Sequence, residues 1–247
     1  MEKGLYDIHN HILPGVDDGS EDLKMSMELI DMEYKSGVRN IIFTPHYIAR
    51  SMVEKCRKMS DDMEEAFEKV KRECEKIHPD MRLKLGNELF YSDRIIEELN
   101  SGRAHIMGKN DKGNRYILTE FNTDIRHQDM KKAISRYQMS GYRPIIAHVE
   151  RYDCLYKEYD IMDELKESGV MFQMNTENFL EGIFSSNKKY CLNLIRNGYI
   201  ELISTDTHNK TTRRPDMEEA VAYLSKKTDG KILQKILYEN PSAIFDS

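Results

Sequence analysis

The chain has 247 residues, of which 39% are hydrophobic and 32% are charged, a balance typical of a folded protein with a well-solvated surface. The length suffices for one large domain, and the formal net charge of −6 weighs against a nucleic-acid partner, which usually needs a basic surface. No apolar run approaches the roughly 20 residues of a membrane span, and residues 1–7 lack the apolar core of a signal peptide, so we expect a cytoplasmic protein without membrane insertion.

Short runs of β-forming residues alternate with helical patterns along the chain. In chain order, we predict strands at 5–9, 38–44, 83–86, 116–121, 143–147, 170–175 and 200–205. The spacing of apolar residues predicts helices at 21–36, 53–77, 93–99, 129–139, 159–167, 188–197, 217–227 and 231–238. Several helices are followed by a C-cap glycine, as at Gly37, Gly141, Gly169 and Gly198. Seven β–α units favour one α/β domain over residues 1–247, with strands arranged like a barrel.

The longest predicted helix, 53–77, carries charges of both signs in mixed order. This pattern is typical of a solvated outer helix with ion pairs between residues four apart, and a partner-binding face is the alternative.

The four cysteines form no CxxC pair, and three fall in predicted helices or in the turn before one. We therefore expect free or buried thiols rather than disulfides at Cys56, Cys74, Cys154 and Cys191.

Five of the eight histidines stand with carboxylates just after predicted strands. The clusters are Asp7-Ile-His-Asn-His11, Thr44-Pro-His46, Ile146-Ala-His-Val-Glu-Arg151 and Thr205-Asp-Thr-His208, while Glu88 and Glu120 stand at two further strand ends. Parallel strands bring their C-terminal ends to one side of the fold, where reactive groups gather. Residues two apart on an extended segment point to the same side, so His9 with His11, and Asp206 with His208, can each present two ligands.

Imidazole and carboxylate ligands without a thiolate suit manganese, iron or zinc in a hydrolytic role. A lone histidine at a strand end is more often structural, but five at matching strand ends indicate a shared site. Only one of the adjacent Asp17 and Asp18 need coordinate. There are nine candidate ligands, which are too many for one ion, so the sequence predicts two or three ions. The candidates are His9, His11, Asp17 or Asp18, His46, Glu88, Glu120, His148, Asp206 and His208.

Other polar residues near these clusters have no ligand role in this prediction. We expect Asp7 to orient a neighbour or cap a turn. The strand at 170–175 offers no obvious ligand, and Asn175 is its nearest polar group. His78, His105 and His127 lie outside the pattern and are expected to be ordinary surface histidines.

The stretch Asp7-Ile-His-Asn-His-Ile-Leu-Pro-Gly-Val-Asp-Asp-Gly19 resembles the first motif of the polymerase-and-histidinol-phosphatase (PHP) superfamily. Its Pro-Gly-Val-Asp-Asp-Gly continuation is similar to the bacterial tyrosine-protein phosphatase branch, which is linked to capsule and exopolysaccharide regulation. The resemblance covers nearly the whole chain, with Asn87 standing where the family often has alanine. Further segments in the family's order are Gly86-Asn-Glu88, Glu120-Phe121, Ala147-His-Val-Glu-Arg-Tyr152, Ser204-Thr-Asp-Thr-His-Asn209 and Arg213-Arg-Pro215.

The resemblance implies a distorted (β/α)7 TIM-like barrel of the PHP fold with a three-metal centre, usually activated by manganese, with iron or zinc as alternatives. One ion would be held by His9, His11, Glu88 and Asp206. Glu88 would bridge to a second ion shared with Glu120 and His148, and a third would bind Asp18, His46 and His208. Asp18 is preferred to Asp17 because it directly precedes Gly19. Arg151 and Arg213 match the family's phosphate-binding arginines, with Arg214 open as an alternative to Arg213, and Asp206 joins them as a catalytic residue.

The implied reaction is hydrolysis of protein phosphotyrosine by a metal-bridged hydroxide, on a bacterial tyrosine kinase with a tyrosine-rich tail. A cysteine nucleophile is not expected, because the residues six positions after the cysteines are Asp62, Asp80, Asp160 and Asn197, and none is arginine. The first alternative is a small-molecule phosphatase such as histidinol-phosphate phosphatase. A phosphodiesterase or nuclease of the same fold, and a non-catalytic binding module stabilised by metal, also remain open.

Overall fold

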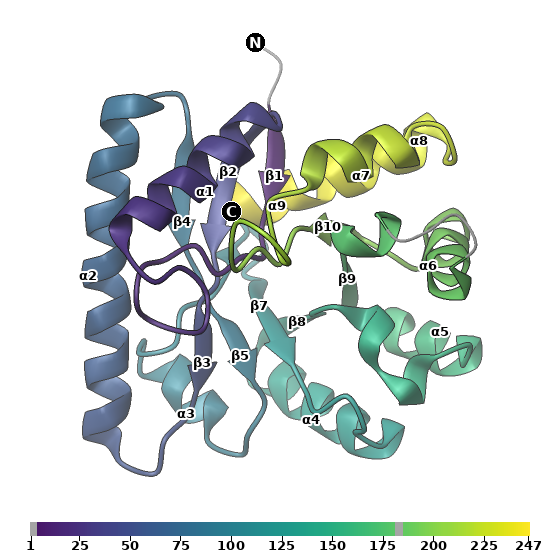
Figure 1. Cartoon of the computed structure of the whole chain (residues 1–247). Helices are drawn as coiled ribbons and strands as arrows, with labels where there is room; N and C mark the ends of the chain where they lie inside the picture. The colour runs from purple at the N-terminus through teal and green to yellow at the C-terminus, as the bar shows by residue number, and fades with distance from the viewer. Residues whose placement is uncertain (1–3, 181–184) are drawn as a thin grey trace.

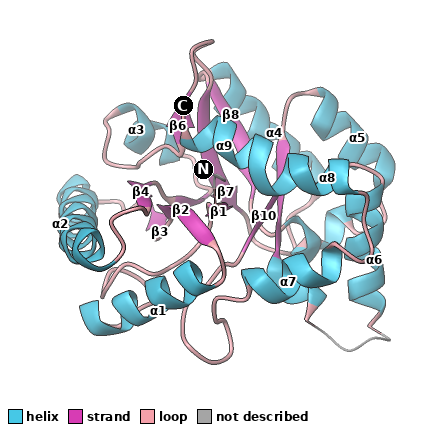
Figure 2. Cartoon of the chain, turned by 90° about the horizontal axis from the view of Figure 1, so that it is seen from above, coloured by secondary structure: helices cyan, strands magenta, loops and turns pink. Residues whose placement is uncertain are grey.

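The computed structural model describes residues 4–180 and 185–247, so the first three residues of the N-terminal segment lie outside the described part. The fold is a mixed α/β architecture in which helices surround parallel strands (Figures 1 and 2). The strands are β1 (Leu5–Asp7), β2 (Val38–Phe43), β3 (His46–Ile48), β4 (Arg82–Leu85), β5 (Glu88–Phe90), β6 (Gly108–Lys109), β7 (Arg115–Glu120), β8 (Tyr142–Ile146), β9 (Met171–Asn175) and β10 (Leu202–Ser204).

The strands of the described residues form two hydrogen-bonded sheets. One sheet has the order β1-β2-β4, and the other has the order β10-β9-β8-β7-β5-β3 with β6 paired antiparallel to β7. At the junction of β1 and β10, Asn10 bridges to Thr207, and the Asp206 amide donates to the His9 carbonyl at 2.8 Å. The predicted α/β class with parallel strands is confirmed, whereas the ladders do not run as one continuous closed sheet.

The helices follow the predicted apolar spacing closely. They are α1 (Leu23–Lys35), α2 (Val53–Ile77), α3 (Ile95–Asn100), α4 (His127–Met139), α5 (Tyr159–Glu167), α6 (Ser186–Arg196), α7 (Met217–Leu224), α8 (Gly230–Gln234) and α9 (Asn240–Phe245). The bounds of α2 and α5 agree with the prediction. The prediction of a single last helix at 231–238 was too simple, because a π-helical turn at Lys235–Glu239 joins α8 to α9. The four glycines expected at helix C-caps all have positive φ angles, as that position requires.

Two short strands next to the predicted metal ligands were missed by the sequence analysis. After β2 the extended chain leaves the ladder at Pro45, which has no N–H to donate, and it resumes as β3 at His46. Similarly, β5 begins three residues after β4 ends. Strands of three residues are too short for an alternating pattern to emerge, so only their pairing in the sheet reveals them.

The strands separate an inner core from an outer one. The inner cluster includes Tyr6 and Ile8 at the start of the chain and is closed by Ile244 and Phe245 of α9. The outer clusters lie between the strands and the surrounding helices. Since α9 and Met107 contribute to the inner cluster, we infer that its other end, at the C-terminal ends of the strands, is left for polar side chains.

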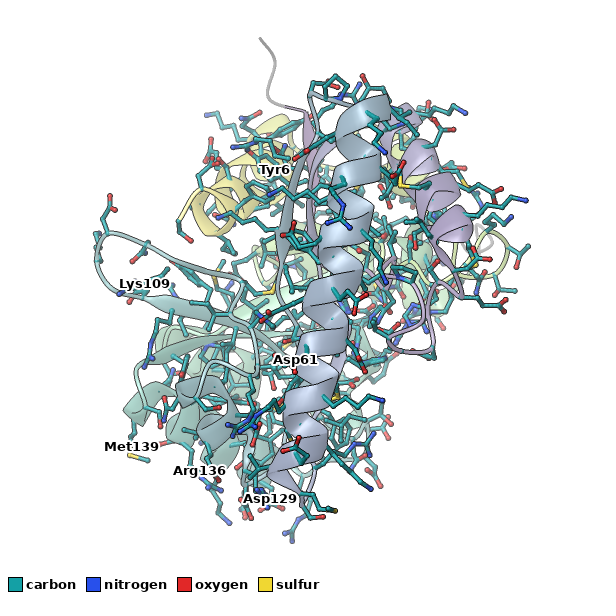
Figure 3. The ribbon with its side chains drawn as sticks, turned by 90° about the vertical axis from the view of Figure 1, so that its left-hand side faces the viewer. Tyr6, Asp61, Lys109, Asp129, Arg136 and Met139 are labelled. Carbon is teal, nitrogen blue, oxygen red and sulfur yellow. The ribbon has the colours of Figure 1, made fainter. Side chains whose placement is uncertain are left out.

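The long helix α2 is a solvated outer helix, as predicted. It buries residues spaced three or four apart, including Cys56, Met63 and Val70. Its other face carries charged side chains, among them Asp61, as Figure 3 shows, and Lys69 pairs with Glu65 one turn earlier. None of the four cysteines, all of which lie in the described residues, is in a disulfide. No helix within residues 4–180 and 185–247 is long and apolar enough to cross a bilayer.

Candidate metal centre

Eight of the predicted ligands converge in one place, next to the ends of β1, β7, β8 and β10 and at the starts of β3 and β5. His9 and His11 follow β1, His46 begins β3, Glu88 begins β5, Glu120 ends β7, His148 follows β8, and Asp206 and His208 follow β10. All but His46 and Glu120 are buried side chains. Burying this many ionisable groups is unfavourable unless they compensate one another or bind a cation.

Glu88 lies at the middle of the cluster. Its two carboxylate oxygens lie 3.2 Å from His9 Nε2, 3.3 Å from His11 Nε2, 3.0 Å from His46 Nδ1 and 2.9 Å from His148 Nε2. Glu120 lies beside it, with an oxygen 3.4 Å from His46 Nδ1 and another 3.5 Å from His148 Nε2. One buried carboxylate thus faces four imidazoles that come from three separate segments of the chain.

Asp206 faces the cluster with one oxygen and two arginines with the other. Its Oδ1 lies 3.5 Å from His9 Nε2 and 3.4 Å from His11 Nε2. Its Oδ2 accepts hydrogen bonds from Arg213 Nη2 at 2.7 Å and from Arg151 Nη2 at 3.2 Å. Asp206 therefore connects the group of imidazoles to the two predicted phosphate-binding arginines.

The adjacent aspartates Asp17 and Asp18 face different partners. Asp17 Oδ2 lies 2.7 Å from His11 Nδ1 and accepts the His46 amide at 3.1 Å. Asp18 Oδ1 lies 3.4 Å from His46 Nε2 and 3.5 Å from His208 Nε2. Asp17 thus orients an imidazole from behind, and Asp18 lies among the donor atoms themselves.

Gly19 makes this loop possible, because a Cβ at that position would lie 2.0 Å from the His11 carbonyl oxygen. The close approach of the loop to the strand end requires a residue without a side chain. The aspartates that precede Gly19 are thereby held against His11 and His46.

Within residues 4–180 and 185–247, three groups of residues have donor atoms close enough together to hold an ion. In each group, one donor atom from every residue lies within 4.8 Å of the others. The groups are His11, Asp18, His46 and His208; His9, His11 and Asp206; and His46, Glu88 and Glu120. His148 belongs to none of these groups, although its Nε2 atom lies beside Glu88 and Glu120.

The hydrogen bonds of three imidazoles test whether the cluster fits a metal. His9 Nδ1 lies 2.9 Å from Gln173 Oε1, His11 Nδ1 contacts Asp17, and His208 Nδ1 lies 2.9 Å from the Asp206 carbonyl. Each partner is an oxygen that can only accept, so each Nδ1 must donate. The Nε2 atoms of the same three rings are buried without a hydrogen-bond partner among the described residues. Their lone pairs are thus free and face the carboxylates, which is the arrangement that a divalent ion needs.

The pKa values of His46 and His148 reflect the negative charge of the neighbouring carboxylates. Burial alone would lower the pKa of His46, but hydrogen bonds to Glu120 and Glu88 outweigh it and raise the pKa to about 10. The same balance raises the pKa of His148 to about 9. His208 behaves in the opposite way, since burial lowers its pKa to about 4. Cations are favoured at His46 and His148, where a bound metal would replace protons.

Two residues of the cluster have unusual backbone angles. His148 has a φ of 34° and Asp206 a φ of 54°, in the left-handed region that non-glycine residues seldom occupy. Such angles cost about 1–3 kcal/mol each and are retained where the surrounding structure holds them. Here each turn directs a donor side chain into the cluster immediately after its strand.

Gln173 and Asn175 on β9 are functional residues that the sequence analysis missed or undervalued. Gln173 Oε1 accepts the His148 amide at 2.8 Å and also holds His9, while Asn175 Nδ2 donates to Asp206 Oδ2 at 2.7 Å. The strand without a ligand therefore supports three ligands from behind. The signal was present as two polar residues, two positions apart, on a strand that is buried throughout.

The remaining predictions for polar residues have mixed outcomes. Asp7 accepts from the Thr205 amide and hydroxyl at 3.0 and 2.8 Å, as expected for an orienting residue. The expectation that His78 is a surface residue was wrong, because the ring is buried and stacks on Tyr34 with 4.0 Å between centroids. His105 and His127 are half-buried. Arg213 contacts Asp206, whereas Arg214 pairs with Glu219 at 2.7 Å.

Comparison with known proteins gives a consistent picture. The family model for capsular polysaccharide synthesis, CpsB/CapC, matches residues 5–246. The tyrosine-protein phosphatase YwqE of Bacillus subtilis (strain 168) is 30% identical over 237 residues, which cover 96% of this chain and 89% of YwqE. The tyrosine-protein phosphatase CpsB of Streptococcus pneumoniae is 29% identical over 245 residues, covering 97% and 98% of the two chains.

A similar structure has also been solved. A chain from the crystal structures of YwqE and CpsB, described as unique metal-dependent tyrosine phosphatases, superimposes with a TM-score of 0.79 and 27% identity. The match covers 98% of this chain and 94% of that chain. Full-length similarity in sequence and in structure therefore accompanies the cluster of ligands.

Proposed function

The chain belongs to the CpsB/CapC family of capsular polysaccharide synthesis, and from that premise we propose that it is a metal-dependent tyrosine-protein phosphatase. Its relatives of nearly equal length are named tyrosine-protein phosphatases, which favours phosphotyrosine over histidinol phosphate. The observation that carries the proposal is Asp206, which faces the imidazole cluster with one oxygen and Arg151 and Arg213 with the other. Metal-assisted hydrolysis of a phosphate monoester uses both features: metal ions that activate water, and adjacent cations that neutralise the phosphoryl oxygens.

We assign the metal ligands as His9, His11, Asp18, His46, Glu88, Glu120, His148, Asp206 and His208. The free Nε2 atoms of His9, His11 and His208 support this assignment, as does the position of Asp18 among the donors. We propose three ions, most simply manganese, with iron or zinc as alternatives, because histidine and carboxylate ligands accept each of them. When bound, such ions supply Lewis acidity and make water acidic enough to ionise near neutral pH.

The arginines bind the phosphoryl group in this proposal. Arg151 and Arg213 are about one-third exposed at their side chains, so their guanidinium groups reach the open side of the cluster. Each uses one amine nitrogen on Asp206, which leaves further N–H groups to neutralise phosphoryl oxygens. Glu177 accepts from Arg151 at 2.8 Å and fixes its orientation. A phenol, with a pKa of about 10, leaves as phenolate with little protonation.

The proposal extends to the fold, the location and the partner. We propose that residues 1–247 form one PHP domain, arranged as a distorted (β/α)7 barrel, in which the two hydrogen-bonded sheets are the distorted halves. The protein would act in the cytoplasm on a phosphotyrosine protein, most simply a bacterial tyrosine kinase with a tyrosine-rich tail. The family's link to capsular polysaccharide synthesis supports a substrate in that process.

Phosphate release from a phosphotyrosine peptide tests the proposal. We expect release with added manganese, loss of release after chelation, and recovery when manganese is restored. Histidinol phosphate at equal concentration should be hydrolysed at least tenfold more slowly. Metal-loaded protein that releases no phosphate from the peptide would refute the assignment, and preference for histidinol phosphate would establish the small-molecule alternative.

A further inference from the structure

Two apolar side chains stand next to the metal centre at the ends of β3 and β5. Ile48 pairs with Phe90 across these strands, and Phe90 pairs in turn with Glu120 at the end of β7. Two residues earlier on the same strands, His46 pairs with Glu88. The paired ligands His46 and Glu88 are therefore followed, two residues farther along β3 and β5, by an apolar pair.

The alternation of side chains places this pair on the same side as the ligands. Tyr47 and Leu89, which lie between the ligands and the apolar pair, are both fully buried in the outer core cluster. Since neighbouring residues on a strand point to opposite faces, Ile48 shares the side of His46, and Phe90 shares that of Glu88. The apolar pair thus faces the mouth of the metal centre rather than the helices.

Neither side chain is used by the described hydrophobic core. Ile48 is 40% exposed, and Phe90 is half-buried but absent from the core clusters of residues 4–180 and 185–247. The ring of a phenylalanine has a large apolar surface, and outside the core that surface is available for contact with a ligand.

We propose that Ile48 and Phe90 form an apolar ledge that receives the phenyl ring of phosphotyrosine, and that Phe90 is a specificity-determining residue. This inference rests on the proposed function and names the part of the protein that recognises the leaving group. The phosphoryl group would lie toward the ligands and the two arginines, which follow β8 and β10. The ring would extend toward β3 and β5, where Phe90 lies next to Glu120. An alkyl phosphate lacks the ring and gains nothing from the ledge.

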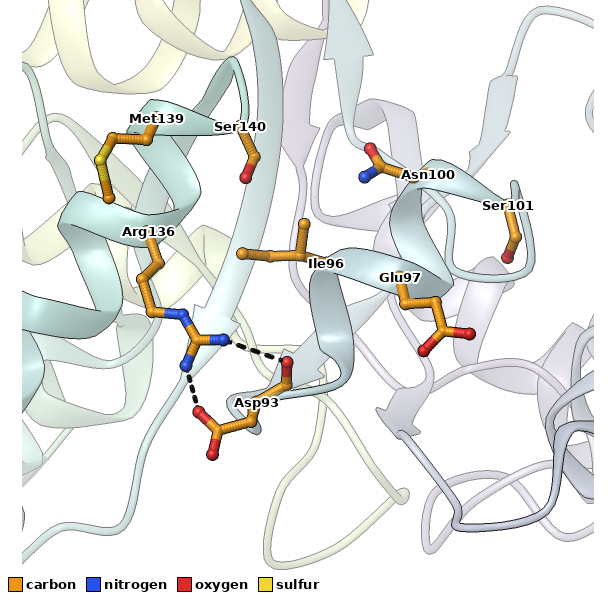
Figure 4. A pocket seen from close by; sticks show the side chains of 8 residues that line it. All are labelled: Asp93, Ile96, Glu97, Asn100, Ser101, Arg136, Met139 and Ser140. Carbon is orange, nitrogen blue, oxygen red and sulfur yellow. Dashed lines mark hydrogen bonds and ion pairs between the residues drawn. The ribbon is translucent and has the colours of Figure 1, made fainter.

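An exposed hollow on the outer surface is the competing place for recognition. It lies between α3 and α4, and Figure 4 shows Ile96 and Met139 on its walls and the Arg136–Asp93 ion pair at one end. Met139 is 78% exposed. The hollow lies on the helices outside the strands and is lined by none of the ligands, so Met139 provides a matched control for loss of an exposed apolar side chain.

Binding of two unreactive phosphonates to the manganese-loaded protein tests the ledge. Calorimetry would compare phenylphosphonate with methylphosphonate, which differ only in the ring, for the parent protein and the variants Phe90→Ala, Phe90→Leu, Ile48→Ala and Met139→Ala. We expect Phe90→Ala to weaken phenylphosphonate binding roughly tenfold, with a smaller loss for Ile48→Ala, and to leave methylphosphonate within about twofold. Phe90→Leu should recover part of the loss, and Met139→Ala should match the parent.

The outcomes separate the ledge from the proposed function. Equal changes for both phosphonates, no change in Phe90→Ala and Ile48→Ala, or no binding of either compound would overturn the ledge. Loss of binding in Met139→Ala alone would overturn it in favour of the outer hollow. A parent protein that binds phenylphosphonate through Phe90 but releases no phosphate from a phosphotyrosine peptide would support the ledge and refute the function. Thermal unfolding and manganese content, measured for each variant, identify a variant that has lost its fold.

Discussion

His148 Nε2 lies 2.9 Å from Glu88 Oε1, although 60 positions separate the two residues along the chain. The contact joins the start of β5 to the strained turn after β8. Glu88 is also within 3.3 Å of His9, His11 and His46, so its carboxylate is the one that most segments of the site share. Changes at this residue should therefore affect the whole centre rather than one ion.

Replacing Glu88 with glutamine should remove most of the bound metal and lower phosphotyrosine turnover by more than about 100-fold. The amide keeps the shape of the carboxylate but loses its charge, and the effect should exceed that of an outer partner of a ligand. Metal content after dialysis and initial rates provide the measurements. The exposed Glu97, on α3, supplies the control Glu97→Gln, which should resemble the parent. Full metal content in Glu88→Gln would contradict the central role.

Asp17→Asn and Asp18→Asn should have different effects on manganese binding. Asp18 lies among the donor atoms, so its loss should lower the number of ions bound. Asp17 holds His11 from behind, so Asp17→Asn should keep the number and weaken affinity by about 10–100-fold. Titration of metal-free protein with manganese gives both quantities. The reverse pattern would transfer the ligand role to Asp17.

Arg213→Gln should lower kcat/KM for a phosphotyrosine peptide by about 10–100-fold, while Arg214→Gln should change it by less than about twofold. A charge-assisted hydrogen bond to phosphate contributes about 1.5–3 kcal/mol, whereas the exposed pair of Arg214 with Glu219 contributes little. Inhibition by inorganic phosphate should weaken in Arg213→Gln alone. Equal losses in both variants would show that the pair acts through local structure.

Cysteine should play no part in turnover. Burial raises the pKa of the Cys74 thiol to about 11 and raises that of Cys154, so neither is a ready thiolate. A variant with serine at Cys56, Cys74, Cys154 and Cys191 should keep its activity within about threefold if it retains the parent's thermal unfolding profile, and iodoacetamide should not inactivate the parent. Complete loss of turnover in the folded variant would revive a cysteine mechanism.

Asp216 should make the metal-free protein less stable as pH rises. Burial raises the pKa of Asp216 to about 7, although Thr176 donates a hydrogen bond to its carboxylate. Because this pKa is above the unfolded value near 4, the group's contribution is most favourable below pH 4 and is lost as pH rises to about 7. We expect Asp216→Asn to exceed the parent by roughly 1–3 kcal/mol in unfolding free energy at pH 8, with a smaller excess at pH 5.

Urea unfolding at both pH values, in the presence of chelator, measures this difference. Asp61→Asn, which replaces an exposed carboxylate on the solvated face of α2, is the control and should match the parent's unfolding free energy at both pH values. A gain for Asp216→Asn that is the same at pH 5 and pH 8 would mean that ionisation of Asp216 is not its cause.

The sequence by itself determined the elements with long repeats and the chemical type of the site. The apolar spacing in 53–77 and 159–167 predicted α2 and α5 to the residue, because burial of one helix face is a local requirement. The pairs His9/His11 and Asp206/His208 each predicted two ligands on one side, because two-residue spacing on an extended chain is also local. The nine candidate ligands together predicted more than one ion. The family resemblance, based on these same motifs, is confirmed.

Only the tertiary structure decided how these pieces meet. Residues 88 and 148 come together through strand pairing across β5, β7 and β8, which no local pattern encodes. The short strands β3 and β5, the buried stack of His78 on Tyr34, and the support from Gln173 likewise depend on distant neighbours. The different roles of Asp17 and Asp18 depend on the direction of one loop, which the lack of a side chain at Gly19 permits. Spacing determines which face a side chain occupies, but packing between distant segments determines what that side chain contacts.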